Sequence, residues 1–183
     1  MDAVELAKIF KEMSAAEDFI GDVLFKSRTY LLAAETVKKV GLDLEKLKET
    51  KGIGKAIITK TKEYLESGRV KKHAELMELI PAKYKKKILT QDAKVLGKRW
   101  REEIKRRFFN EDGTLKSWPS KYSTKFYVLK EIARNFKRNR VYTENEVNMI
   151  LAPIYEDHIT LRRYLINYGF MRRTKDGSEY KRD

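Results

Sequence analysis

The chain is constrained most by one stretch, Thr50-Lys51-Gly52-Ile53-Gly54-Lys55-Ala56-Ile57, in which two glycines flank an apolar residue ahead of a helical pattern. Gly52 and Gly54 allow the backbone to take positive φ and to approach a ligand closely. We expect Ile53 to anchor the turn in a core while the next three amides stay unpaired at a helix N-terminus. Unpaired amides and the helix dipole favour an anion, so the pattern predicts a phosphate-binding turn. The alternative is a turn that packs and binds nothing.

Helical periodicity surrounds this turn on both sides. Apolar residues three and four apart predict five helices, over residues 3–16, 27–40, 43–49, 55–67 and 71–79. Gly41 and Gly68 stand where the second and fourth helices should end. The second helix is expected to turn four residues inward: Tyr30, Leu31, Ala34 and Val37. The first ninety residues therefore predict an all-helical module.

Charge indicates the class of partner. The chain has 41 Lys and Arg against 27 Asp and Glu, a formal net charge of +14, so an anionic macromolecule is expected. Without cysteine there is no disulfide or thiol site, and His73 and His158 alone do not predict a metal site, so we expect no metal and no cofactor. No stretch approaches about 18 uninterrupted apolar residues, and Met1–Glu5 lacks the basic start of a signal peptide. The sequence predicts a soluble, cytoplasmic protein with no membrane partner.

Three stretches stand in this helix order: Leu6-Ala7-Lys8-Ile9-Phe10, Arg28-Thr29-Tyr30-Leu31-Leu32-Ala33-Ala34 and Lys51-Gly52-Ile53-Gly54-Lys55-Ala56-Ile57. With Gly68-Arg69-Val70-Lys71-Lys72 they resemble the N-terminal lyase-type domain of family X DNA polymerases over roughly the first 85 residues. The resemblance implies a helix-hairpin-helix fold that holds gapped or single-stranded DNA by its 5′-phosphate. Some members of that family cleave an abasic sugar through a lysine Schiff base. Polymerase activity is excluded, because the chain lacks the paired-aspartate strand that would hold two metals.

Residue by residue, the resemblance places the Schiff-base lysine at Lys60 and the phosphate-site lysine and tyrosine at Lys26 and Tyr30. A lysine nucleophile needs a lowered pKa, which crowding by Lys26, Lys55 and Lys72 and partial burial would provide. Two interpretations stay open: Lys60 is catalytic, or it is one cation of a DNA-binding surface. That surface comprises Lys26, Tyr30, Gly52, Gly54, Lys55, Lys60 and Lys72.

Pro81 and the basic run Lys83-Tyr84-Lys85-Lys86-Lys87 predict a solvated joint. A helix over residues 92–109 follows, and its apolar side is expected to be Val95, Leu96, Trp100, Ile104 and Phe108. The opposite side carries Lys98, Arg99, Arg101, Lys105 and Arg106, which either follow phosphates or face water. The expected organisation is a first domain over 1–88, a linker helix over 89–108 and a second domain over 109–183.

The second domain predicts three helices and a hairpin. The first helix covers residues 122–136 and the third covers residues 158–168. The second helix begins at a capping box formed by Thr143 and Glu146. Asp176-Gly177 between two short runs predicts a β-hairpin, and the whole predicts a winged helix-turn-helix. Its third helix would enter the major groove of DNA and its wing would contact the backbone. The expected contacts are Thr160, Arg162, Arg163, Asn167, Arg172, Arg173 and Lys175.

Four stretches of this half are characteristic: Phe108-Phe109-Asn110-Glu111-Asp112-Gly113, Tyr142-Thr143-Glu144-Asn145-Glu146-Val147-Asn148, Thr160-Leu161-Arg162-Arg163-Tyr164-Leu165 and Asp176-Gly177-Ser178-Glu179-Tyr180. They resemble an uncharacterised prokaryotic domain family that ends some winged-helix regulators, and the resemblance implies a fold without an activity.

The sequence thus predicts a mainly α protein of two small domains, a helix-hairpin-helix bundle and a winged helix-turn-helix with a short β-hairpin wing. The expected function is DNA binding without sequence specificity by the first domain, with a second contact from the winged helix, in DNA repair or transcriptional regulation. A DNA lyase using Lys60 is one alternative. A scaffold that recruits a protein partner through the winged helix is the other.

Overall fold

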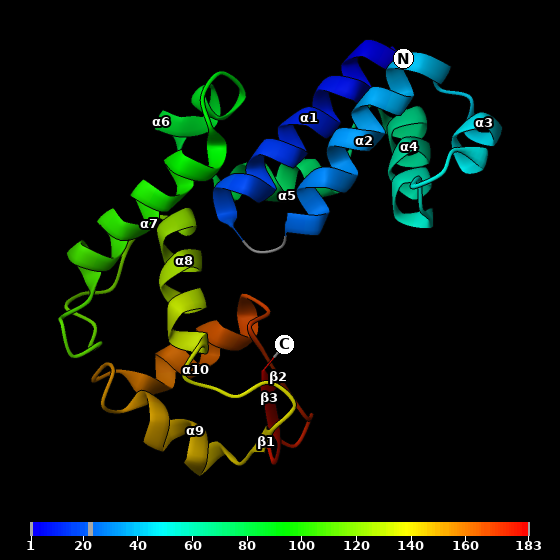
Figure 1. Ribbon diagram of the computed structural model, residues 1–183. Coiled ribbons are helices and arrows are strands. Elements are labelled where there is room, and N and C mark those ends of the chain that lie inside the picture. The colour runs from blue at the N-terminus through cyan, green and yellow to red at the C-terminus, as the bar shows by residue number, and fades with distance from the viewer. Residues whose placement is uncertain (1, 22–23, 183) are drawn as a thin grey trace. The chain divides into compact units, whose positions relative to one another are not determined.

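The structure, a computed structural model that describes residues 2–21 and 24–182, is mainly helical with one small antiparallel sheet (Figure 1). The predicted mainly α class with a short β-hairpin is confirmed. The chain divides into two compact units, Met1–Trp100 and Arg101–Asp183. The elements are α1 (Ala3–Ile20), α2 (Leu24–Val40), α3 (Leu44–Glu49), α4 (Lys55–Ser67), α5 (Lys71–Leu79), α6 (Ala82–Lys85), the 3-10 helix η1 (Lys87–Leu89), α7 (Ala93–Phe108), α8 (Tyr122–Ala133), β1 (Val141–Tyr142), α9 (Glu144–Leu151), α10 (His158–Asn167), β2 (Met171–Arg173) and β3 (Tyr180–Arg182).

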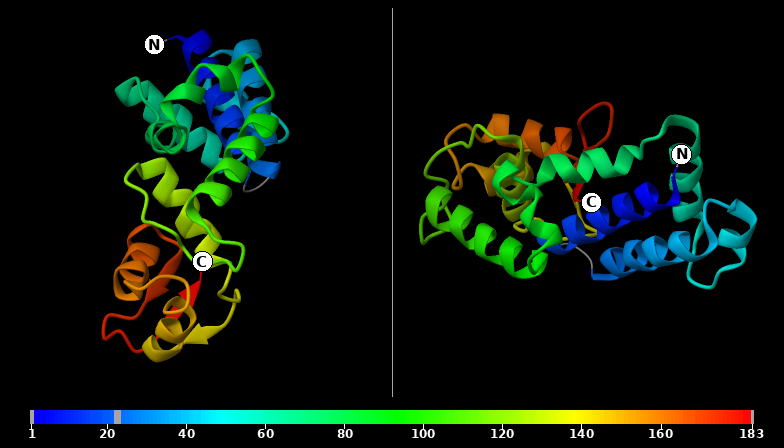
Figure 2. Two further views of the ribbon diagram at one scale, coloured as in Figure 1. Left: turned by 90° about the vertical axis from the view of Figure 1, so that its left-hand side faces the viewer. Right: turned by 90° about the horizontal axis from the view of Figure 1, so that it is seen from above.

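The first unit is built on α1 and α2, which lie side by side in every view (Figure 1, Figure 2). Their buried stripes meet, and the ring of Phe10 stacks on the ring of Tyr30 with centroids 6.3 Å apart. Helix α1 runs four residues past the predicted end, because Phe19 and Ile20 continue its buried stripe. It ends at Gly21, whose φ of 70° stops the helix.

The prediction that Leu31 faces inward is wrong, because its side chain is 45% exposed. The buried stripe of α2 follows the spacing i, i+3, i+4 and i+7 through Tyr30, Ala33, Ala34 and Val37.

The basic run after Pro81 is a folded part of the first unit, and the expectation of a solvated joint is wrong. Tyr84 of α6 packs on Phe19 of α1 with ring centroids 5.2 Å apart, and Ile88 of η1 is buried. At the end of this segment Trp100 packs on the same Phe19, with centroids 5.4 Å apart. Three apolar anchors therefore hold residues 82–100 against α1.

Helix α7 buries Trp100, Ile104 and Phe108 as predicted, but the prediction that Val95 faces inward is wrong. Val95 is 44% exposed, whereas Ala93, Trp100 and Ile104 are buried. The small residue Gly97 is buried between them. The stripe at spacings of three and four therefore starts at Ala93, and Val95 lies outside it.

The second unit packs α8, α9 and α10 beside a three-stranded antiparallel sheet of order β1-β3-β2. Tyr142 of β1 pairs with Tyr180 of β3, and Met171 of β2 pairs with Arg182. Strand β1 was not predicted, because two residues are too short to show an alternating pattern. The buried side chains of this unit include Leu129, Ile132, Phe136, Val147, Leu151, Leu161, Leu165, Met171 and Tyr180.

Helix α8 ends at Ala133, three residues before the predicted end. The amides of Asn135 and Phe136 donate to carbonyls three residues back, Ile132 and Ala133, so the last turn tightens out of the α-helical pattern. The side chain of Phe136 is buried, as predicted, although it lies after the end of α8.

Candidate nucleic-acid interface

The turn between α3 and α4 uses its two glycines differently. Gly52 takes φ of 90°, as expected, but Gly54 is extended, with φ of −87° and ψ of 171°, so positive φ at Gly54 was a wrong prediction. Ile53 between them is 8% exposed, and its amide donates to the carbonyl of Thr50 at 3.1 Å. This bond and the burial of Ile53 fix the turn to the unit.

Gly54 is the N-cap residue of α4, and no side chain of the described residues caps this helix start. The amide of Ile57 donates to the Gly54 carbonyl at 2.9 Å. The three residues before Ile57, beginning with Gly54 and including Lys55, are exposed. Their amides thus point from a helix N-terminus toward solvent, with a lysine among them, which is the arrangement that favours an anion.

Gly52 also lies close to Leu32 of α2. A Cβ added to Gly52 would come within 2.6 Å of Cδ2 of Leu32. The positive φ is what favours glycine here, because the exposed end of Leu32 can rotate away from a new Cβ. Nothing in the sequence predicts this contact, because Leu32 lies twenty residues before Gly52.

Lys60 of α4 and Tyr30 of α2 come together in the first unit. The Lys60 Nζ atom lies 5.8 Å from the centroid of the Tyr30 ring and donates to the carbonyl of Ala56 at 3.3 Å. Partial burial lowers the pKa of Lys60, and the charge of Lys72 lowers this pKa further, while Glu63 and Glu75 act in the opposite direction. Of the three lysines expected to crowd Lys60, Lys72 is the one whose charge acts in this way.

Tyr30 is 8% exposed, so most of its ring belongs to the core. Burial, with a smaller effect from the nearby charge of Glu17, raises the pKa of Tyr30 to about 12. The phenol therefore stays neutral and keeps its O–H proton. Lys26, four residues earlier on α2, is exposed. Lys72 is exposed as well and pairs with Glu75 at 3.1 Å.

In the second unit, the predicted contacts on α10 separate into two groups. Arg163 and Asn167 are exposed, and Thr160 is half-buried with its amide donating to the N-cap carboxylate of Asp157 at 3.1 Å. Arg162 lies on the other side of the helix, and its side chain is 12% exposed. The structure therefore leaves Arg163 and Asn167 available to a partner and removes Arg162 from that surface.

Arg162 instead connects α10 to α9 and β3. Its guanidinium pairs with Glu144 at 2.9 Å and donates to the Asn148 side chain. It also lies 5.9 Å from the ring centroid of Tyr180, whose hydroxyl donates to Glu144 at 3.1 Å. The sequence carries no local signal for this role, because Glu144 and Tyr180 are each 18 residues away from Arg162 along the chain.

The hairpin formed by β2, β3 and the turn between them carries exposed cations. Arg172, Arg173 and Lys175 are all exposed. The amide of Thr174 donates to the Glu179 carbonyl at 3.0 Å and closes the turn. The predicted contacts of the wing thus lie on an ordered hairpin.

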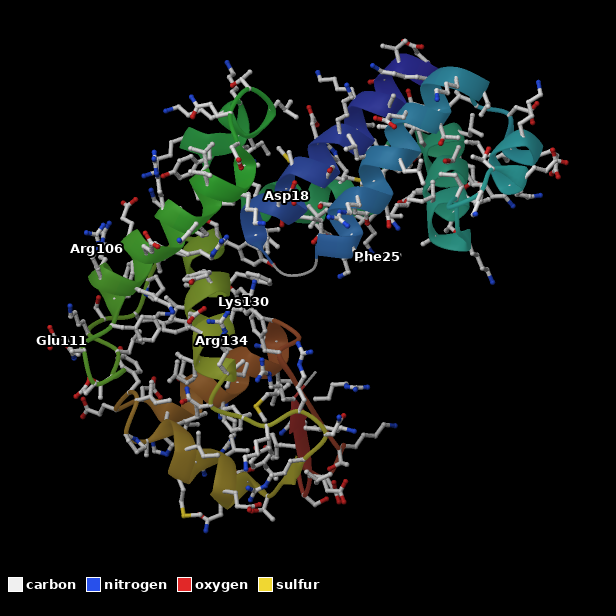
Figure 3. The ribbon with its side chains drawn as sticks, viewed as in Figure 1. Asp18, Phe25, Arg106, Glu111, Lys130 and Arg134 are labelled. Atoms are coloured by element: carbon white, nitrogen blue, oxygen red, sulfur yellow. The ribbon has the colours of Figure 1, made fainter. Side chains whose placement is uncertain are left out.

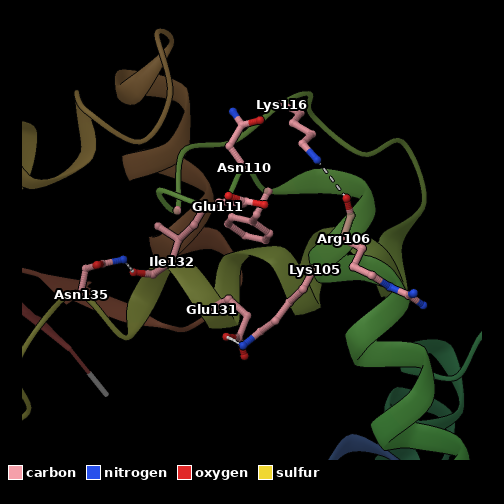
Figure 4. Close-up of a pocket in the computed structure, with 10 residues that line it drawn as sticks. Lys105, Arg106, Asn110, Glu111, Lys116, Glu131, Ile132 and Asn135 are labelled. Atoms are coloured by element: carbon pink, nitrogen blue, oxygen red, sulfur yellow. Dashed lines mark hydrogen bonds and ion pairs between the residues drawn. The ribbon is translucent and has the colours of Figure 1, made fainter.

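A cavity of about 560 Å³ lies between the end of α7, the loop that follows it and α8 (Figure 4). Its polar groups bond one another: Glu131 pairs with Lys105 at 2.9 Å, and the Lys116 amine donates to the Arg106 carbonyl at 3.0 Å. Arg134, the residue directly after α8, pairs with that carboxylate at 2.9 Å. These groups stabilise the corner between α7 and α8.

Paired helices joined by a glycine turn define the class of the N-terminal part, a helix-hairpin-helix unit. Residues 1–70 match the family model described as "Helix-hairpin-helix domain". Residues 114–182 match the one described as "Uncharacterized protein conserved in bacteria (DUF2087)". A search of curated proteins finds no match to the chain. The first match supports nucleic-acid binding, with DNA as the partner.

Among the described residues, no helix has the length and apolar character needed to cross a membrane.

Proposed function

We propose that this protein binds DNA through the phosphate backbone at the hairpin between α3 and α4, without regard to sequence. The observation that carries the proposal is the uncapped start of α4 behind Gly52 and Gly54, within the part that matches a helix-hairpin-helix domain. Exposed amides at a helix N-terminus bind phosphate oxygens, and Lys55 adds a charge. The resemblance to the N-terminal domain of family X polymerases supports a role in DNA repair, and transcriptional regulation is the alternative setting.

The second unit would add a DNA contact as a winged helix-turn-helix. The order α8, β1, α9, α10, β2, β3 and the sheet order β1-β3-β2 are those expected of that fold and support the proposal. In this arrangement α10 is the helix for the major groove, with Arg163 and Asn167 outward. Linking two modest binders raises the affinity of the whole through effective concentration.

The test measures the dissociation constant for a DNA duplex and a gapped duplex at several salt concentrations. Lys55→Gln is expected to weaken binding on every sequence and to lower the slope of log K against log salt by about 0.9. The double variant K8Q/K11Q is the control, because both lysines are exposed on α1, away from the hairpin sequence. A wild-type protein that binds neither DNA in low salt would refute the proposal.

Arg163→Ala with Asn167→Ala tests the second unit separately. If α10 contacts base edges, this variant loses affinity for some duplex sequences more than for others. Unchanged DNA binding would instead favour a protein-binding role for the second unit.

A second candidate function, a lyase acting on an abasic sugar phosphate, rests on Lys60. Its lowered pKa, which partial burial and the charge of Lys72 cause, increases the fraction of neutral amine, the form that attacks an aldehyde. Addition of the amine to the C1′ aldehyde and loss of water would give an imine, which borohydride reduces to a stable amine.

The trapping experiment uses gapped DNA with an abasic 5′ sugar phosphate. An adduct in the wild type that disappears in Lys60→Ala, but persists in Lys62→Ala on the same helix, would support the lyase. DNA binding without any adduct would leave the first function alone.

A further inference from the structure

Residues 82–100 lie outside both matched families and are the most basic part of the first unit. They contain seven Lys or Arg and one acidic residue, Asp92. This stretch therefore carries +6 of the chain's net charge of +14. We call it the basic segment.

The basic segment is folded, so its cations are held on a defined surface. Tyr84, Ile88 and Trp100 turn inward and anchor it, two of them against the ring of Phe19. Side chains that end in nitrogen project from α6 and α7 (Figure 3). Pre-ordered cations lose less conformational entropy on binding than cations on a flexible linker.

Six cations of the segment are exposed, and no carboxylate of the described residues lies within ion-pair distance of any of them. They are Lys85, Lys86, Lys87, Lys94, Lys98 and Arg99. The carboxylate of Asp92 is engaged, since it accepts the amides of Lys94 and Val95 at 3.0 and 3.1 Å as the cap of α7. By contrast, Lys46 and Lys48 on α3 each pair with a carboxylate three residues away.

This concentration of like charge lowers the stability of the fold. Lys94 and Lys98 are four residues apart on one face of α7, about 6 Å along the helix axis, where like charges repel. Lys85, Lys86 and Lys87 are consecutive. A bound anionic polymer would remove this repulsion by neutralising several of the cations at once.

We propose that the basic segment is a second phosphate-binding surface of the first unit, which neutralises backbone phosphates of DNA beyond those held at the hairpin. The proposal rests on the proposed DNA binding. A lipid surface fits the segment less well, because membrane-surface helices present a continuous apolar face outward. Here Ile88 and Trp100 are buried, and the exposed large apolar side chains are Leu89 and Val95.

The test compares the salt dependence of DNA binding for two double variants, K86Q/K87Q and K94Q/K98Q, with that of K8Q/K11Q, which removes the same charge from α1. Each basic-segment variant is expected to lower the slope of log K against log salt by about 1.8. Between about 50 and about 200 mM salt, the wild type then loses roughly 12-fold more affinity than the variant. The slope of K8Q/K11Q is expected to equal that of the wild type. Circular dichroism checks that each variant is folded.

The outcomes are distinct. Wild-type binding with equal slopes in all three variants overturns the basic-segment proposal and leaves the hairpin proposal intact. Absence of wild-type binding overturns both. Vesicles of phosphatidylserine and phosphatidylcholine form a second arm: binding lost only in the basic-segment variants, with unchanged DNA slopes, would assign the surface to anionic lipid and overturn the proposal.

Discussion

Gly52→Ala tests the hairpin most directly. The residue has φ of 90°, where an L side chain costs about 1–2 kcal/mol, and the new Cβ would come within 2.6 Å of Leu32 Cδ2. Leu32 is 37% exposed, so its end can rotate away and this contact adds little to the cost. The expected destabilisation of the first unit is therefore about 1–2 kcal/mol, or a fall in Tm of roughly 4–8 °C for each kcal/mol in a unit of this size.

The same change should weaken DNA binding beyond its effect on folding. Moving one amide out of line with a phosphate oxygen removes a charge-assisted hydrogen bond of about 1.5–3 kcal/mol, so affinity falls at least about tenfold. Fluorescence anisotropy with labelled duplex, at a temperature well below Tm, measures this loss.

Gly68→Ala is the matched control, because Gly68 lies at the opposite end of α4 with φ of 68° and no atom within 4 Å of an added Cβ. It should lower Tm by a similar amount and leave affinity unchanged. If Gly52→Ala folds and binds DNA as the wild type does, the hairpin is not the phosphate site. If Gly68→Ala loses as much affinity for DNA as Gly52→Ala, the loss in both variants is caused by the lower stability of the first unit.

Three further outcomes are expected. Lys72→Gln removes a charge that lowers the pKa of Lys60, so this pKa rises and borohydride trapping at neutral pH slows; an unchanged pH profile of trapping would refute the link. Arg162→Met should destabilise the second unit by about 1–2 kcal/mol in urea unfolding, because Glu144 and Asn148 each lose the bond to the guanidinium; an unchanged midpoint would contradict this. The hydrogen bond from the backbone amide of Lys46 is the main reason why the pKa of Asp43 lies below its usual value of 3.8. The Asp43 cap therefore stabilises α3 fully above about pH 3.8, and this stabilisation is lost as the pH falls through the lowered pKa. Asp43→Asn should weaken this acid sensitivity, which unfolding at about pH 5 and about pH 3 measures.

Long periodic segments with a marked end were predictable from the sequence. The helices α4 and α5 have the predicted bounds, because the glycine turn and Gly68 fix the ends of one and the apolar spacing defines the other. The capping box of Thr143 and Glu146 is confirmed, since both of its bonds are present. These signals are local, so the residues within about one turn decide them.

Features that depend on distant residues were not predictable. The run Lys83–Lys87 is polar in sequence, and its folding into α6 and η1 depends on Phe19, some sixty residues earlier. Likewise, Arg162 looks like a solvent-facing cation until Glu144 and Tyr180 are brought beside it. In both cases a tertiary contact decides which side of a short helix is covered.

The two phosphate-binding surfaces proposed for the first unit differ in a way that one set of measurements separates. A backbone amide is neutral, so the loss of its hydrogen bond to a phosphate lowers the affinity without changing the number of counterions that DNA releases on binding. A lysine that neutralises a phosphate displaces a counterion, so removing that lysine changes the salt slope itself. Gly52→Ala should therefore shift the line of log K against log salt downward in parallel, whereas K86Q/K87Q should make the line shallower. Near-parallel lines for both would mean that the basic segment does not neutralise phosphate, and a shallower line for Gly52→Ala would mean that the hairpin change displaces lysines as well as amides.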